Sequence, residues 1–174
     1  MIDSSPVFER DDLDDPLVIV LVGLPGSGKT WFTEALIASQ PTISERPWTR
    51  LSQDLVKNRK AFQSLSTRAA STIGVSCRVV VDKVNATVKE RKELLDRLLN
   101  PTRVMAIYFE VAPNECIRRI KTRGPHPTLP PDKAEVAVGS FRNTIKRPSE
   151  EEGFTKIFTV RTFRESERLL KLFQ

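Results

Sequence analysis

The sequence predicts an α/β fold, a doubly wound parallel sheet of five strands with helices on both faces. Three observations predict this fold class. Short apolar runs rich in β-branched residues recur along the 174 residues, and helix-length segments separate them. Because parallel neighbours in a sheet are joined by a crossover, this alternation indicates a parallel sheet. The first run, LVIVLV at 17–22, is apolar throughout, as in a strand that is buried on both faces.

The expected strands begin after a polar leader and end near the C-terminus. The first strand ends at Gly23, where a glycine-rich turn begins. SCRVVVD and RVMAIYFEV are clear further examples, because each contains an apolar run of strand length. In chain order the expected strands are residues 17–22, 48–51, 76–82, 103–111 and 155–160.

Expected helices lie between and after these strands, and glycine or proline ends several of them. Pro41 and Pro101 end two helices, Gly74 and Gly124 end two others, and Pro113 suits the first turn of a helix. In chain order the expected helices are residues 31–39, 55–71, 86–100, 113–123, 132–145 and 165–173.

Charge divides the chain into an acidic leader, residues 1–16, and a basic body, residues 17–174, which has the length of one domain. The leader holds six acids and one arginine, which gives it a net charge of −5. Because the whole chain has a net charge of +6, the body has a net charge of +11. A basic body favours nucleic acid or nucleotides as partners, and solubility alone is the alternative explanation. The leader is expected to be flexible and is a candidate contact for a partner protein.

Composition excludes several classes of protein. No apolar run approaches about 18 residues, so no membrane span is expected. The leader lacks the basic start and the apolar stretch of a secretory signal. Two cysteines and one histidine exclude a disulfide framework and a Cys/His zinc cluster. The expected location is therefore a reducing compartment, nuclear or cytoplasmic.

A phosphate-binding loop directly follows the first expected strand. Its sequence, GLPGSGKT at 23–30, matches G-x-x-x-x-G-K-[ST], which predicts binding of ATP or GTP with Mg²⁺. The glycines let backbone N–H groups turn inward around phosphates, and the following helix presents its positive N-terminus. The loop leaves hydrolase, kinase and switch open as functions. The residues expected at the nucleotide are Gly23, Pro25, Gly26, Ser27, Gly28, Lys29, which reaches the β- and γ-phosphates, and Thr30, whose hydroxyl binds Mg²⁺.

Two carboxylates lie at the ends of expected strands, where parallel sheets gather functional residues. Asp54 follows the second strand and is either a general base for an attacking hydroxyl or the cap of the next helix. Asp82 ends VVVD, the position of a carboxylate that orients Mg²⁺ or substrate; a turn residue at a strand end is the alternative.

Arg119 and Arg123 predict a lid. They are four residues apart, so they project from one helix face, and a proline-rich loop follows them. Their guanidiniums would bind the phosphates of the donor and the charge that develops during transfer. A solvated basic face is the alternative.

Four further residues are candidates for contact with the substrate. Lys57 and Arg59 follow Asp54 closely, so their charges would hold an anionic acceptor with its hydroxyl directed at that carboxylate. Asn85 and Arg91 follow Asp82, Asn85 as a polar positioning residue and Arg91 either in a substrate role or on a solvated helix face.

These segments together resemble the P-loop kinase domain of polynucleotide 5′-hydroxyl kinases, as in polynucleotide kinase 3′-phosphatases and the bacteriophage kinase. The resemblance covers most of residues 17–160 and includes GLPGSGKT and SQD, which ends at Asp54. VVVDKVNATVKER is similar to V-V-I-D-N-T-N-x-x-x-x-x-R, and PSEEEGF at 148–154 is similar to P-x-x-x-E-G-F. RxxxRG, which starts at Arg119, matches the lid of the family.

The resemblance implies a P-loop kinase fold with an arginine-bearing lid and 5′-hydroxyl ends as the acceptor. Two departures bear on the substrate: Gln53 replaces the arginine that usually precedes the base, and D-K-V-N replaces D-N-T-N. No D-x-D-x-T phosphatase motif is present in this sequence. The implied roles are general base for Asp54, phosphate and Mg²⁺ binding for Lys29 and Thr30, and donor contacts for Arg119 and Arg123.

Three functions follow as hypotheses. The first is transfer of the γ-phosphoryl group of ATP, or of another nucleoside triphosphate, to the 5′-hydroxyl end of DNA or RNA, as in end repair. The second is a small-molecule kinase on the same scaffold, and the third is a regulatory module that depends on a bound nucleotide. Only the first predicts acceptor binding that weakens steeply as salt rises.

Overall fold

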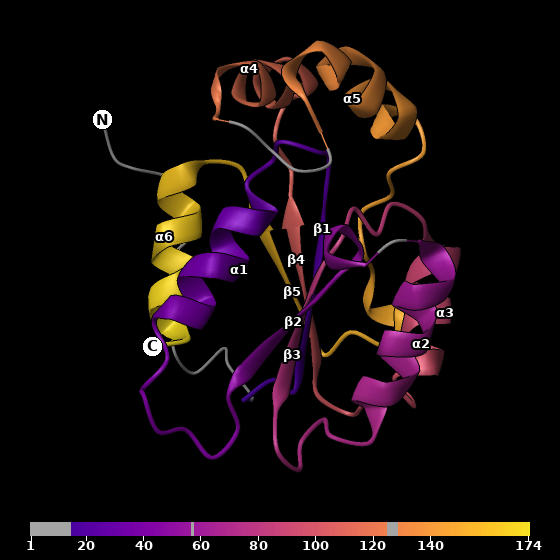
Figure 1. Ribbon diagram of the computed structural model, residues 1–174, viewed down its shortest axis with the longest axis vertical. Coiled ribbons are helices and arrows are strands. Elements are labelled where there is room, and N and C mark those ends of the chain that lie inside the picture. Colours follow the sequence, from indigo (N-terminus) through magenta and orange to yellow (C-terminus); the bar gives the residue numbers. More distant parts are fainter. Residues whose placement is uncertain (1–14, 57, 125–128) are drawn as a thin grey trace.

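The computed structural model describes residues 15–56, 58–124 and 129–174. Its sheet has five parallel strands in the order β2-β3-β1-β4-β5, with helices on both faces (Figure 1). The predicted fold class is therefore confirmed. After β1, the chain first adds β2 and β3 on one side of β1 and then crosses over to add β4 and β5 on the other side. Open α/β sheets place their ligands at the carboxyl ends of the strands around such a crossing.

All five predicted strands are present, with bounds that differ from the expected ones by a few residues. β1 is buried along its whole length, since β3 and β4 flank it and helices cover both faces. Its alternate side chains enter different cores: Val20 and Val22 face one core, and Ile19 and Leu21 face the other. The strands are β1 (Val18–Gly23), β2 (Trp48–Ser52), β3 (Arg78–Asp82), β4 (Val104–Phe109) and β5 (Lys156–Val160).

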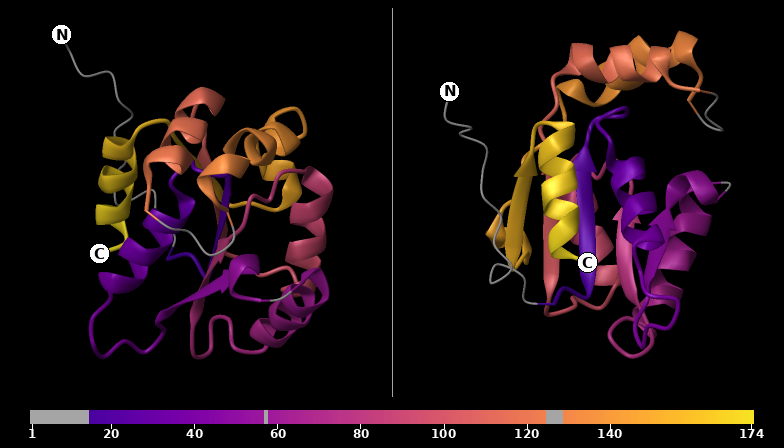
Figure 2. Two further views of the ribbon diagram at one scale, coloured as in Figure 1. Left: turned by 45° about the horizontal axis from the view of Figure 1, so that its top comes forward. Right: turned by 90° about the vertical axis from the view of Figure 1, so that its left-hand side faces the viewer.

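The helices form a layer on each face of the sheet and a further pair at its carboxyl edge (Figures 1 and 2). The core on one face includes α1 and α6, and the core on the other includes α2 and α3, whereas α4 and α5 pack on each other above the strand ends. In the part of the chain that the structure describes, every helix is too short or too polar to cross a membrane. The helices are α1 (Lys29–Ala38), α2 (Arg59–Ala70), α3 (Val88–Arg97), α4 (Pro113–Thr122), α5 (Ala134–Arg142) and α6 (Phe163–Leu172).

The helix predicted at 55–71 starts later than expected, because two separate caps interrupt it. The Ser52 side chain accepts a hydrogen bond from the Asp54 N–H at 3.2 Å and begins the short 3₁₀ helix η2 (Gln53–Leu55). The Asn58 side chain then accepts from the Ala61 N–H and caps α2. Asp54 is therefore not the cap of α2, which was the alternative to its predicted role as a general base.

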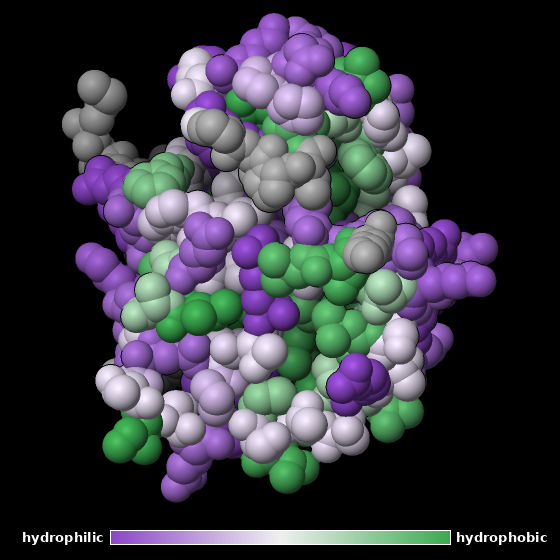
Figure 3. Space-filling model, in the orientation of Figure 1, coloured by the Kyte–Doolittle hydropathy of each residue, from purple (hydrophilic) through white to green (hydrophobic). Residues whose placement is uncertain are grey.

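The interruption also shapes the surface beside the strand ends. Leu55, next to Asp54 on η2, is 64% exposed. Apolar side chains gather on this face of the molecule over the segment between β2 and α2, whereas mostly polar side chains cover α4 and α5 (Figure 3). Asp54 is itself exposed beside Leu55.

The last acid of the leader is held against the body. Asp15 forms ion pairs with Arg46 at 3.0 Å and with Arg78 and Arg103 at 3.5 Å each. These arginines lie at or just before the amino ends of β2, β3 and β4. The prediction of a flexible leader therefore does not extend to Asp15, and residues 1–14 lie outside the described residues.

Candidate active site

The glycine-rich loop leaves β1 at Gly23, passes the half-buried Pro25 and reaches α1 at Lys29. Gly26 and Gly28 have φ angles of +81° and +107°, in the left-handed region that glycine adopts without strain. Gly28 precedes α1 and offers no capping side chain, so the first N–H groups of the helix are left without a side-chain acceptor. A loop of this form at a helix N-terminus is suited to hold an anion.

Lys29 is buried beneath this loop. Its ammonium donates hydrogen bonds to the carbonyl oxygens of Gly23 at 2.8 Å and Leu24 at 2.7 Å, and to Ser27 Oγ at 3.3 Å. Burial lowers the pKa of Lys29 from 10.5 to about 8, although the Asp82 carboxylate acts in the opposite direction. The amine therefore holds the loop together by bonding to three of its oxygens.

The loop also packs directly on α4, which carries the first predicted lid arginine. An added Cβ on Gly26 would lie 2.5 Å from the carbonyl oxygen of Cys116 in that helix. Arg119 Nη1 donates to the Ser27 carbonyl at 3.3 Å, while Glu115 holds Arg119 Nε at 2.7 Å. Arg119 therefore bonds to the phosphate loop itself, so that α4 and the loop form one unit, and its contact with donor phosphates stays a prediction.

Replacing Gly26 with alanine is expected to destabilise the protein by about 1–2 kcal/mol from its positive φ alone, and by more from the clash with α4. The reason is that the Cβ would meet helix backbone, which cannot move aside as a flexible side chain could. Urea unfolding measures the change. Gly139→Ala is the matched control, because Gly139 lies in α5 with open space around it and alanine there should stabilise the helix. Equal stabilities of the two variants would contradict the packing described.

Asp54, an exposed residue of η2, and Arg123, directly after α4, both act electrostatically on the buried Lys29. Burial is the largest cause of the lowered pKa of both cations. The Asp54 carboxylate acts in the opposite direction on each of them, and the Arg123 guanidinium adds to the lowering of the Lys29 pKa. Arg123 Nη2 donates to the Leu129 carbonyl at 3.2 Å, and its buried Nε has no hydrogen-bond partner among the described residues. The structure thus brings three predicted catalytic residues within electrostatic reach of one another.

The oxygens that could hold Mg²⁺ are those of Thr30 and Asp82. Thr30 is half-buried in the first turn of α1, and Asp82 ends β3 with its side chain 4% exposed. Within the described ranges, no three His, Cys, Asp or Glu side chains form a metal-binding group. Mg²⁺ commonly takes one or two protein oxygens and completes its shell with water and phosphate, and Thr30 and Asp82 fit that pattern.

Arg91 is not exposed for the predicted contact with a substrate, and it does not lie on a solvated helix face either, because its side chain is fully buried. Its Nε and Nη2 donate to the two carboxylate oxygens of Glu152 at 2.7 and 2.8 Å. Nη1 donates to the carbonyls of Asn85, Ala86 and Lys146. The pair joins VVVDKVNATVKER to PSEEEGF, so the two segments that carried the family resemblance meet in one structural contact.

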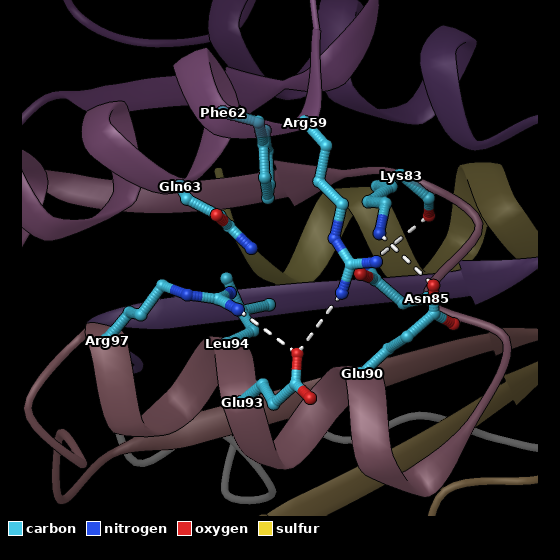
Figure 4. A pocket seen from close by; sticks show the side chains of 9 residues that line it. All are labelled: Arg59, Phe62, Gln63, Lys83, Asn85, Glu90, Glu93, Leu94 and Arg97. Atoms are coloured by element: carbon cyan, nitrogen blue, oxygen red, sulfur yellow. Dashed lines mark hydrogen bonds and ion pairs between the residues drawn. The ribbon is translucent and has the colours of Figure 1, made fainter.

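Asn85 and Arg59 line a groove between α2 and α3 (Figure 4). Asn85 has a φ of +48° and donates its amide to the Leu21 carbonyl of β1 at 2.7 Å, so it also fixes the end of β3 to β1. Arg59 and Arg97 both donate to Glu93 Oε2, at 3.4 and 3.2 Å. Lys57 lies outside the described residues. The groove is lined by Arg59, Phe62, Gln63, Lys83, Asn85, Glu90, Glu93, Leu94 and Arg97.

Comparison with known proteins places the chain in a family. The model of the AAA domain family AAA_33 matches residues 18–148. No curated protein sequence matches the chain. Kti12 of Chaetomium thermophilum, solved in complex with ADP-AlF3, has a similar structure with a TM-score of 0.65 and 16% identity over 88% of this chain and 95% of that one.

Two kinases of known structure share the same fold. A fungal RNA kinase matches with a TM-score of 0.65 and 16% identity over 90% of this chain, which spans only 42% of that kinase. The Mycobacterium tuberculosis APS kinase CysC, in complex with AMPPNP and APS, matches with a TM-score of 0.62 and 14% identity over 90% of this chain and 96% of that one. At these identities the likeness is one of fold. The chain therefore belongs to the AAA domain family AAA_33 and has a P-loop kinase-like fold.

Proposed function

We propose that this protein transfers the γ-phosphoryl group of ATP, or of another nucleoside triphosphate, to the 5′-hydroxyl end of DNA or RNA. The observation that supports the proposal is that the Asp54 carboxylate and the Arg123 guanidinium both act electrostatically on Lys29 at the phosphate loop. A nucleotide-binding switch needs the loop and its lysine. A kinase needs in addition an acid that can accept a hydroxyl proton beside the terminal phosphate, and Asp54 supplies one.

The reaction divides among the residues as follows. The acceptor oxygen bonds to the γ-phosphorus while the bond from that phosphorus to the β,γ-bridging oxygen breaks, so that a nucleoside diphosphate leaves. Asp54 takes the proton of the hydroxyl. Lys29 and the loop N–H groups hold the phosphates, and Arg119 and Arg123 stabilise the charge that spreads over the transferred group. Mg²⁺, when bound through Thr30 and Asp82, would neutralise phosphate charge.

Three features favour a nucleic-acid acceptor. The basic body carries +11, which suits a polyanion. Three cations, Arg59, Lys83 and Arg97, outnumber the two carboxylates with which they pair in one groove, and Arg59 begins the helix that follows Asp54. The sequence segments around Asp54, Asp82 and Arg119 resemble those of polynucleotide kinases, and an RNA kinase is among the similar folds.

A small-molecule kinase is the second candidate, and the similarity to APS kinase favours it because this chain spans nearly all of that enzyme. Transfer of radiolabel from γ-labelled ATP tests both candidates on one panel of acceptors: 5′-hydroxyl DNA and RNA oligonucleotides, nucleosides, sugars and adenosine 5′-phosphosulfate. Labelling of the oligonucleotides supports the proposal. Labelling of a small molecule alone would replace it by the second candidate, and nucleotide binding without labelling of any acceptor would favour a regulatory module.

Nucleotide binding is expected to take up a proton above the lowered pKa of Lys29. The free amine has a pKa of about 8, and adjacent phosphates favour its charged form, so the pKa rises in the complex. Affinity should then fall up to about tenfold for each pH unit above 8. Calorimetry at about pH 9 in two buffers of different ionisation enthalpy measures the uptake. Lys29→Arg, whose guanidinium stays charged, should show none, and an equal uptake in that variant would assign the proton to another group.

Arg59→Ala is expected to raise the KM for an oligonucleotide and to lower its dependence on salt, with little change in the KM for ATP. One lost phosphate contact should reduce the slope of log KM against log salt by about one. Arg68→Ala is the matched control, since Arg68 is also an exposed arginine on α2 but does not line the groove. Equal effects of the two substitutions would show that Arg59 contributes only to the overall positive charge and makes no specific contact with the oligonucleotide.

A further inference from the structure

Arg50 of β2 is bonded to the candidate metal ligand Asp82, although no sequence motif includes it. In the parallel pairing of β2 with β3, Ser52 lies opposite Asp82 and Arg50 lies opposite Val80. Arg50 and Asp82 are therefore diagonal neighbours on one face of the sheet, close enough for long side chains to meet. Arg50 Nη2 donates to Asp82 Oδ2 at 2.6 Å, and the two side chains are 18% and 4% exposed.

A cation is consequently bonded to the carboxylate that is placed to serve Mg²⁺. Arg50 pairs with Asp82 directly, and both side chains are largely shielded from solvent. A divalent cation that approached Asp82 without a nucleotide would meet the positive charge of Arg50, which is already bonded to one oxygen of this carboxylate. Like charges at such distances repel strongly where water is largely excluded.

Arg50 also differs from a purely structural arginine in the same molecule. Arg91 uses Nε, Nη1 and Nη2 in hydrogen bonds and is fully buried. Arg50 forms one short bond to Asp82 and a longer ion pair with Glu34 at 3.7 Å, and its buried Nε has no hydrogen-bond partner among the described residues. A guanidinium with an unmet buried donor gains less from its position than one that is fully bonded, so it can exchange partners at lower cost.

We infer that Arg50 is a resident counter-cation, which occupies Asp82 in the nucleotide-free protein and admits a divalent cation to this carboxylate only together with a nucleotide. The phosphates bring the negative charge that offsets the added cation and offer the guanidinium another acceptor. The inference rests on the proposed nucleotide site, but it does not depend on which acceptor is phosphorylated. It predicts that metal and nucleotide bind as a unit and that Asp82 alone does not recruit metal.

Mn²⁺ binding, followed by electron paramagnetic resonance without nucleotide, tests the inference without any assay of activity. Arg50→Gln is expected to bind Mn²⁺ at least about tenfold more tightly than the unmodified protein, because a repelling charge has been removed. The gain should disappear in Arg50→Gln/Asp82→Asn and should be absent from Arg50→Lys, which keeps the charge. Arg161→Gln is the matched control, since it removes the same charge from an exposed pair with Glu110.

An unchanged or weaker Mn²⁺ affinity of Arg50→Gln would overturn the inference, as would a gain that survives in the double variant or appears in Arg50→Lys. Asp82→Asn in the otherwise unmodified chain gives a second measurement that does not require Arg50→Gln to fold. It should leave Mn²⁺ affinity unchanged without nucleotide and lower it when a non-hydrolysable ATP analogue is present. Loss of affinity without nucleotide would show that Asp82 was already available to metal. Loss of oligonucleotide labelling with these metal results intact would instead count against the proposed acceptor.

Discussion

Asp54→Asn is expected to lower the rate of phosphoryl transfer by about 10²–10⁴-fold while leaving nucleotide binding intact. The amide keeps the size of the carboxylate but cannot take the proton of the attacking hydroxyl. Because the Asp54 charge lies near Lys29 and Arg123, its removal also leaves the phosphate loop more positive. Affinity for the anionic nucleotide should therefore be equal or slightly higher, which separates a chemical defect from a loss of folding. Single-turnover transfer and nucleotide titration on the same preparation measure the two effects.

Asp96→Asn provides the control for that experiment, because Asp96 is an exposed aspartate on α3 that does not line the groove. Its substitution changes the net charge by the same amount and should leave the rate unaltered. A normal rate for Asp54→Asn would remove the acid on which the kinase proposal depends, even with ATP bound. A loss of nucleotide affinity in that variant would assign Asp54 to binding rather than to proton transfer.

The strands and the phosphate loop could be predicted from the sequence because their signals are local. LVIVLV is apolar on both faces, which a central strand of a covered sheet accommodates, and all of it except Leu17 lies in β1, whose residues are all buried. The phosphate loop directly follows this strand, so the position of the loop could be predicted without any contact between distant segments. The helix at 55–71 was placed too early, since Ser52 and Asn58 compete for the backbone N–H groups that a continuous helix would use.

The contacts of Arg50 and Arg91 could not be predicted, because each depends on a partner that is distant in sequence. Arg50 meets Asp82 through the register of β2 on β3, and an alternating pattern shows which residues share a face but not which strand lies alongside. Arg91 meets Glu152 across two separate segments. The spacing of both segments resembles that of the family, but a charged residue in a motif does not reveal whether it faces a ligand or another residue, so the predicted substrate contact of Arg91 did not anticipate Glu152 as its partner.

Arg91→Met is expected to destabilise the fold by about 3–5 kcal/mol, because it leaves the Glu152 carboxylate buried without its cation. The carbonyls of Asn85 and Lys146, which accept hydrogen bonds from Arg91 Nη1 at 2.9 and 3.0 Å, would also lose their donor in this variant. Urea unfolding measures the change. Arg161→Met, which breaks an exposed pair with Glu110, should change stability by about 1 kcal/mol or less.

The double variant Arg91→Met/Glu152→Met decides between a structural and a substrate role for this arginine. Replacing both charges removes the unpaired buried carboxylate, so much of the lost stability should return, and the coupling between the two sites should be large and favourable. A substrate contact would behave differently: each single variant would keep its stability, and Arg91→Met alone would impair oligonucleotide use. Since Arg91 also holds the Asn85 carbonyl, and Asn85 fixes the end of β3 to β1, the pair sets where Asp82 stands relative to Lys29. A stable double variant with a slow transfer step would therefore show that Arg91 positions the site without touching the acceptor.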